Sequence, residues 1–321
     1  MASLLAAGAA SNVTFGQSSP FLSFVNSATC YANLSTLIGS GSVSSFQQSV
    51  LSALNTSVST LIPSTDPDVI EGYKALYLAN AQNFLTSPVG QVELLLYATG
   101  NLGGTDQTIS IQLALQHPFS QGRLWITTND AFDAPSLDPQ YFSHPADIQL
   151  MRAGVKLARI IAGTAPLKNI LGTEDSPGPN VTADADIDTF IAGGCSTEFH
   201  PANTLAMLPQ NQGGVVDAKL RIYGLQNVRV VDASVFPLQF AAHVSPGLLS
   251  ASAWDCIGAD LAIYRCNGPS TPWPSKVLRS SVTSTTASLM IRAPRPQAMA
   301  IAPLITTVTR AEPPRCLLRL S

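Results

Sequence analysis

Charge, long apolar runs and paired cysteines are all scarce in this chain of 321 residues. Only 12% of the residues are charged and the formal net charge is −3, which argues against nucleic acid as a partner. No apolar run reaches the ~18 residues that a membrane span requires, so no membrane partner is expected. The five cysteines include no CxxC pair, which argues against a zinc or redox motif.

The remaining composition is that of a globular protein. Hydrophobic residues make up 45% of the chain, and its length allows two domains and a large core. The opening segment MASLLAAGAA has no basic n-region, so it does not read as a signal peptide. Four glycosylation sequons, starting at Asn12, Asn33, Asn55 and Asn180, nevertheless favour an ancestry in the secretory pathway.

Apolar periodicity predicts helices in the first part of the chain. Residues 1–45 are rich in Ser, Ala and Gly, have no clear period and are expected to be irregular. From Phe46 to Leu61 apolar residues recur at steps of three and four, which predicts a helix. Asp66-Pro67 then predicts the start of a second helix.

A change of period after residue 107 predicts strands. Apolar and polar residues alternate from Ile109 to Leu115, as a half-buried strand requires, and Leu124–Thr128 is expected to return beside it. Ser143-His144-Pro145 is typical of a helix start, with serine as the cap and proline in the first turn. Gly163 can end that helix.

The last third of the globular part predicts a strand at Val228–Asp232 and a final helix from Ser245. Gly213-Gly214 is expected to shape a turn. Asp217 and Arg221 are expected to pair.

The tail from residue 267 to 321 differs in charge and composition. It holds seven basic residues and one acidic residue, a net charge of +6, whereas residues 1–266 carry −9. Eight of the 23 prolines fall in it, among Ser/Thr clusters with no sustained period. These features predict a disordered tail.

Two of the four histidines are candidates for acid/base chemistry. His200 and His243 flank a segment that ends in a strand and an aspartate, and a free imidazole titrates close to neutral pH. Such a pair at the mouth of a cofactor pocket can exchange protons with a substrate. His117 and His144 each precede a proline and are expected to be structural.

The segment from Phe199 to His243 resembles the C-terminal signature of the glucose–methanol–choline (GMC) flavin oxidoreductases. The run from His117 to Ile161 is also similar to that family. The signature is carried by motifs in the family's order and spacing: His200-Pro201-x-x-Thr204, Gly213-Gly-Val-Val-Asp217, Arg221, Tyr223-Gly224, Val228–Val231, Asp232-Ala-Ser234, Pro237 and His243.

The resemblance implies an α+β fold, with an antiparallel sheet flanked by helices as the substrate domain and a C-terminal strand–helix piece of an incomplete FAD-binding domain. It divides the chain into an irregular segment 1–45, a substrate-binding domain 46–195, a signature and return segment 196–266, and the tail 267–321.

The resemblance also implies FAD as cofactor and a small-molecule alcohol as substrate. His200 would take the hydroxyl proton while hydride passes to the flavin, and His243 would hold the alcohol oxygen. Asp232 and Ala233 would approach the ribityl–pyrophosphate region, although Asp232 could instead cap the next turn. His243 and Val244 would lie against the flavin ring. Oxygen or a quinone would accept the electrons.

Phe199 precedes the implied base, as in aryl-alcohol oxidases, where it stacks on an aromatic substrate. Core packing is the alternative for this side chain. The position where the glucose oxidases carry a sugar-binding arginine holds Ser196, which weakens the case for a sugar. Asn203 replaces the glycine usual in His-x-x-Gly-Thr, so the local turn is expected to differ.

The Gly-x-Gly-x-x-Gly turn that approaches the FAD pyrophosphate in this family does not occur in the sequence. We therefore expect a truncated FAD-dependent alcohol oxidoreductase. The open alternatives are a non-catalytic remnant that does not bind FAD alone and a hydroxynitrile lyase on the same scaffold. The resemblance and the sequons imply an extracellular origin.

Overall fold

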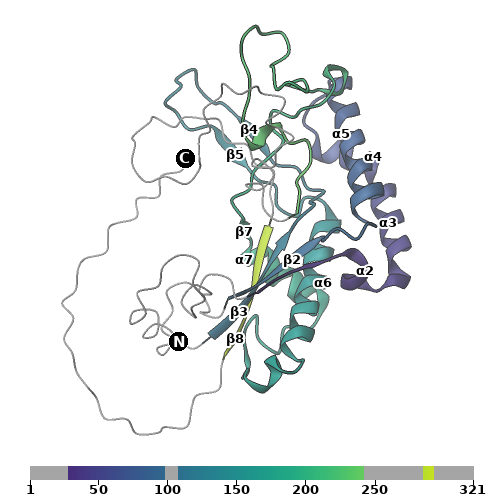
Figure 1. Cartoon of the computed structure of the whole chain (residues 1–321), viewed down its shortest axis with the longest axis vertical. Coiled ribbons are helices and arrows are strands. Elements are labelled where there is room, and N and C mark those ends of the chain that lie inside the picture. The colour runs from purple at the N-terminus through teal and green to yellow at the C-terminus, as the bar shows by residue number, and fades with distance from the viewer. Residues whose placement is uncertain (1–27, 98–107, 242–284, 293–321) are drawn as a thin grey trace, which may run out of the picture.

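A six-stranded antiparallel sheet forms the centre of the protein (Figure 1). The computed structural model describes residues 28–97, 108–241 and 285–292. The strands follow the order β1-β2-β3-β8-β6, with β7 also paired to β8, and all pairs are antiparallel. Their bounds are β1 Ala28–Ala32, β2 Val92–Tyr97, β3 Thr108–Leu115, β6 Glu174–Ser176, β7 Ser196–Thr197 and β8 Thr285–Arg292.

Helices flank this sheet, as the predicted α+β fold requires. α6 contacts β2, β3 and β8, and α7 contacts α6 and β8. α3, α4 and α5, which lie between β1 and β2 in the chain, form a column at one side of the sheet (Figure 1). The bounds are α2 Leu34–Ile38, α3 Val43–Ser52, α4 Leu54–Leu61, α5 Pro67–Ala79, α6 Pro145–Ala162 and α7 Asp184–Gly194.

The main core lies between α6 and the sheet. Leu150, Met151 and Ala158 of α6 are fully buried. A Cβ added at Gly154 would lie 3.1 Å from Val92 Cγ1 of β2, so the absence of a side chain there lets the helix approach the sheet closely. Because burying such side chains contributes about 1.5–3 kcal/mol each, this contact holds the two layers together.

The single helix predicted over Phe46–Leu61 is instead two helices, α3 and α4, separated at Ala53. The starts of α5 and α6 agree with the sequence except at one cap. Asp66 caps α5, since its side chain accepts from the amide of Asp68, and Pro67 takes the first helical position. At α6 the cap is His144, whose Nδ1 accepts from the amide of Ala146 at 3.1 Å. Ser143 is therefore not the cap: the proline follows His144 directly, so His144 holds the position before the first turn.

The expectation of an irregular segment over residues 1–45 is wrong for residues 28–45. β1, α2 and the start of α3 lie there. β1 owes its form to its partner strand, since Ala32 pairs with Val92 and Ala28 with Leu96. Its own sequence, ATCYA, carries no apolar alternation that could have announced a strand.

The expectation of a disordered tail over residues 267–321 is also wrong for one segment. Thr285–Arg292 is β8, which pairs with β3 on one side and with β6 and β7 on the other. Backbone hydrogen bonds to three strands stabilise it, and composition does not reveal such non-local pairing. The rest of the tail lies outside the described residues.

The other strand predictions are met in part. β3 lies where predicted, but Ser110 and Ala114 on its second face are buried as well, so the strand is not half-buried. The expected return strand is β4, Arg123–Trp125, which pairs with β5, Ser136–Asp138, in a separate two-stranded sheet. It does not return beside β3.

Val228–Asp232 is not a strand. This stretch contributes one isolated bridge, between Arg221 and Arg229, and Val228 and Val231 are 43% and 40% exposed. A compact apolar strand needs neighbours on both sides, and none flanks it among the described residues. The predicted helix from Ser245 lies outside them.

Candidate active site

Residues 199–241, here called the signature segment, have little regular structure but their own small core. Val216, Leu220, Val230 and Val235 are buried together in it. Short 3-10 turns occur at Gln210–Gln212 and Ala233–Val235. The segment is therefore held by local contacts and by its attachments to the larger core.

One attachment is the contact of Gln210–Gln212 with α5. A Cβ added at Gly72 of α5 would lie 2.0 Å from the carbonyl oxygen of Gln212, so the two backbones touch. Gly213 follows with φ +67°, and a Cβ at Gly214 would lie 1.9 Å from the Leu208 carbonyl. Only glycine fits this turn, which confirms the prediction for Gly213-Gly214.

The two ends of the signature segment are bonded to each other. The chain after His200 lies beside the chain that leads towards His243. Three hydrogen bonds join them: Leu205 N to Ser234 O at 3.0 Å, Met207 N to Val235 O at 2.8 Å, and Asn203 Nδ2 to Pro237 O.

Asn203 explains how this sequence tolerates the loss of the glycine usual at its position. Its φ is +81°, a left-handed conformation that asparagine adopts more readily than most residues. Its side chain donates to the carbonyl of Pro237. The turn therefore keeps the left-handed backbone conformation that glycine readily adopts, and the asparagine side chain adds a hydrogen bond to Pro237.

His200 follows β7, which pairs with β8 at the sheet, and its side chain is half-buried. Phe199 before it has φ +63° and is 81% exposed. Core packing is therefore wrong for Phe199 within the described residues. A bulky residue held at positive φ costs free energy, and this conformation carries the phenyl ring away from the core.

Asp232 caps the turn Ala233–Val235, as the alternative interpretation of this residue predicted. Its Oδ1 accepts from the amide of Ser234 at 2.8 Å and from the Ser234 hydroxyl. Its other oxygen, Oδ2, has no hydrogen-bond partner among the residues described. Ala233 is half-buried. The two remaining predicted site residues, His243 and Val244, lie outside the described part of the chain.

A buried polar face of the sheet was missed from the sequence. Glu93 of β2 is 1% exposed and accepts from Tyr31 Oη at 2.8 Å and from Gln116 Nε2 at 3.2 Å. Burial, the bond to Glu93 and the charges of Glu93 and Glu198 raise the pKa of Tyr31. Because Glu198 acts on this face, the chain just before His200 lies near it. The signal was a lone glutamate inside the apolar run VELLLY.

The remaining polar residues that were expected to have structural roles make structural contacts. Asp217 pairs with Arg221 at 2.6 Å, and its bonds to Arg221 lower its pKa to about 2. Burial lowers the pKa of His144 to about 4, and its Nε2 lies 2.9 Å from Tyr77 Oη. His117 is buried and bonded to Gln239.

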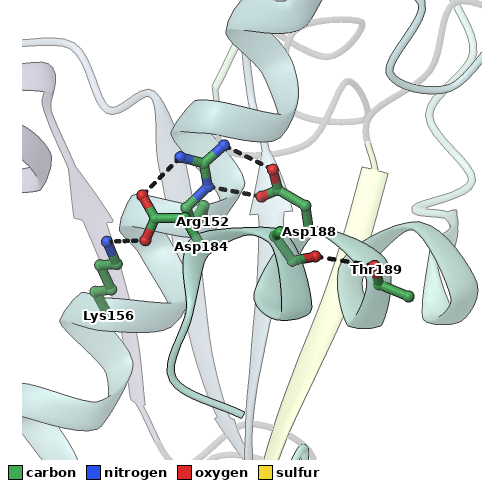
Figure 2. A network of polar contacts seen from close by, with 6 residues as sticks. Arg152, Lys156, Asp184, Asp188 and Thr189 are labelled. Atoms are coloured by element: carbon green, nitrogen blue, oxygen red, sulfur yellow. Dashed lines mark hydrogen bonds and ion pairs between the residues drawn. The ribbon is translucent and has the colours of Figure 1, made fainter.

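Charged residues also join α6 to α7 (Figure 2). Arg152 bonds Asp188 with two nitrogens, at 2.6 and 2.7 Å, and reaches Asp184 with a third at 2.9 Å. Lys156 reaches the other oxygen of Asp184 at 2.6 Å. These cations are neutralised by their partners, so the network connects helices rather than binding an anion.

The described residues contain no group of three or more metal-ligating side chains. None of their helices combines the length and apolarity needed to cross a bilayer.

Comparison with known proteins identifies the class of this chain. Residues 118–249 match the GMC oxidoreductase family model for the C-terminal domain. The predicted resemblance is confirmed: the chain carries the C-terminal domain of the GMC oxidoreductases.

Individual relatives agree with this assignment. The GMC oxidoreductase family protein Mala s 12 of Malassezia sympodialis is 38% identical over 224 residues, which are 69% of this chain and 34% of that protein. An alcohol dehydrogenase [acceptor] of Pseudomonas putida is 39% identical over 128 residues, 40% of this chain and 23% of the relative. The chain thus spans about a third or less of the length of these relatives.

Two solved structures share the fold. An FAD-dependent oxidoreductase from Chaetomium thermophilum aligns with a TM-score of 0.62 at 26% identity. A fungal aryl-alcohol oxidase aligns with a TM-score of 0.61 at 27% identity. Each alignment covers 71% of this chain and 38% of the other.

Proposed function

We propose that this chain supplies the substrate side of an FAD-dependent alcohol-oxidising site, with His200 as general base and His243 as its partner on the alcohol oxygen. The observation that carries the proposal is the set of hydrogen bonds that joins residues 203–207 to residues 234–237. His200 lies three residues before the first stretch and His243 six residues after the second. These bonds therefore join the chain just after His200 to the chain that leads towards His243.

The chemistry assigned to these residues is a proton transfer. A nitrogen of the His200 imidazole takes the hydroxyl proton of the alcohol, and His243 hydrogen-bonds the alcohol oxygen as negative charge develops on it. General-base catalysis of this kind contributes about 10²–10⁴-fold. FAD, when bound, accepts the hydride from the alcohol carbon.

The residues described fit one part of FAD. Asp232 Oδ2 is available to a hydroxyl of the ribityl chain, because Oδ1 alone makes the cap. The exposed phenyl ring of Phe199 can stack on an aromatic alcohol, which favours an aryl or other apolar primary alcohol. No phosphate-binding glycine turn occurs in the sequence, so the cradle for the pyrophosphate has to come from elsewhere.

The test starts with the visible spectrum of the purified chain after incubation with FAD. If flavin is retained, benzyl alcohol added without oxygen is expected to bleach it. His200→Ala should slow this bleaching about 10²–10⁴-fold, whereas Gln210→Ala, an exposed change in the same segment, should not alter it. Normal bleaching by His200→Ala would refute the role of His200. A chain that stays colourless supports the non-catalytic remnant.

The secretory origin belongs to this proposal as well. It is supported by the four sequons. Of these, Asn33 caps α2 through its Oδ1, which leaves its Nδ2 available for a glycan.

A further inference from the structure

His117 joins the sheet to the signature segment across 122 residues of sequence. It lies two residues after the end of β3, and its side chain is 4% exposed. Its Nδ1 is 2.8 Å from the carbonyl oxygen of Gln239. A carbonyl only accepts, so Nδ1 carries the proton and donates it.

The imidazole is fixed on its other sides. Phe84 stacks on it with ring centroids 5.1 Å apart and an interplanar angle of 17°. The side chain of Asn80 donates to the main-chain carbonyl of His117 at 3.2 Å. Both residues belong to the π-helical turn Asn80–Phe84 after α5. The ring therefore has one orientation, and its donor points at Gln239.

The second ring nitrogen fixes the charge state. Nε2 is buried and has no hydrogen-bond partner among the described residues, so protonating it would bury an unpaired N–H and a positive charge. Burial accordingly lowers the pKa of His117, while the bond to Gln239 opposes that shift.

The nearby carboxylates hold the chain on either side of His117. Glu93 accepts from Gln116, and Asp147 accepts from the amides of Phe119 and Ser120. Neither carboxylate is hydrogen-bonded to the His117 ring, whose Nδ1 is bonded to Gln239. The buried Nε2 therefore favours the neutral form of the ring.

We propose that His117 is a positioning residue: its neutral imidazole holds the main chain at Gln239 and so fixes the end of the signature segment. His243 is four positions after Gln239, a stretch of chain that spans at most about 14 Å. Movement at Gln239 would therefore shift the start of the stretch that leads to the second histidine. The consequence for catalysis rests on the proposed function, but the attachment of Gln239 to His117 does not.

Two substitutions separate the hydrogen bond from the packing. His117→Asn keeps an N–H donor near the place of Nδ1 but cannot titrate. His117→Phe keeps a ring against Phe84 but has no donor. His144→Asn is the matched control, since it changes the other buried histidine and asparagine still caps a helix.

The measurement is hydrogen–deuterium exchange of peptides within residues 229–241. At pH 7.5 we expect His117→Phe to speed exchange there about tenfold, while His117→Asn and His144→Asn stay close to the unmodified chain. Unchanged exchange in His117→Phe, or equal acceleration by Asn and Phe, would overturn the proposal.

A second readout covers the case in which His117→Phe does not fold. Corrected for intrinsic exchange, protection of residues 229–241 should fall more steeply below about pH 6 in the unmodified chain than in His117→Asn, because the substitution removes the titratable side chain that is bonded to Gln239. Identical pH profiles for the two proteins would contradict the proposal.

Catalysis gives an independent comparison. In a flavin-loaded enzyme, His117→Phe should lower kcat about tenfold or more while the flavin spectrum is unchanged. If exchange responds as expected and kcat does not, the attachment stands and the proposed function is what fails.

Discussion

At the scale of single residues, two buried groups with opposite pH behaviour meet at the start of α6. Asp147 accepts from the amides of Phe119 and Ser120 at 2.9 and 2.8 Å, yet its burial raises its pKa to about 6. Burial lowers the pKa of His144, three residues earlier, to about 4. Both groups therefore tend to be neutral near pH 5.

Their effects on stability oppose each other between about pH 4 and 6. The folded pKa of His144 is below its free value of 6.5, so its contribution is lost as pH falls from about 6.5 to 4. The folded pKa of Asp147 is above its free value of 3.8, so stability is lost as pH rises from about 4 to 6. In the unmodified chain these two slopes partly cancel.

Single substitutions should reveal how His144 and Asp147 each change the free energy of unfolding with pH. Relative to the unmodified chain, Asp147→Asn should gain stability as pH rises from 4 to 6, and His144→Asn should lose it, each by about 1–3 kcal/mol. Urea unfolding at pH 4, 5 and 6 measures the free energy of unfolding. Parallel pH profiles for the two variants would show that the assignments are wrong.

At the scale of elements, the contact between α6 and α7 depends on Arg152 (Figure 2). Its paired bonds to Asp188 are the better shielded, since the Asp188 side chain is 27% exposed and that of Asp184 is 53% exposed. A bidentate guanidinium–carboxylate pair is stronger than a single contact.

Asp188→Asn is expected to lower the free energy of unfolding by about 1 kcal/mol. Asp184→Asn, the control on the same helix, should have a smaller effect that disappears in 1 M salt. The urea midpoint of each variant in low and high salt checks this. An equal or larger loss for Asp184→Asn would contradict the ranking.

The helices and strands differ in how clearly their own sequences predict them. α5 and α6 begin with Asp66-Pro67 and His144-Pro145 and carry strong apolar faces, so local signals sufficed. β1 and β8 have no such signal, because their pairing partners lie far along the chain. Val228–Asp232 shows the converse: its apolar sequence suits a strand, but no strand flanks it in the part of the chain that the structure describes.

Site residues show the same division. The histidine spacing and the glycine turn could be read from the motif, and Asn203 could be singled out as a departure from it. The link between His117 and Gln239 could not be predicted, because it joins residues 122 positions apart. Nor could the exposure of Phe199, which depends on a positive φ that its residue type does not suggest.

At the scale of the whole molecule, β8 decides whether the sheet is continuous. It separates β3 from β6 and β7, so its removal would leave unpaired edges on both sides. A chain ending after residue 284 is expected to aggregate or associate, whereas one ending after residue 292 should behave like the full chain. Light scattering and size-exclusion chromatography test this. A monomeric, cooperatively folding 1–284 chain would show that β8 is dispensable.

The position of β8 also affects when this protein can complete its fold during synthesis. Ile111 of β3 pairs with Leu289 of β8. The edge of β3 that pairs with β8 therefore stays unpaired until about 180 further residues have been synthesised. At 5–20 residues per second, the delay is about 10–35 s. Throughout it, a nascent chain offers an unprotected strand to its neighbours on the polysome. Yield in a host cell is therefore expected to depend on translation speed and chaperone supply as much as on final stability.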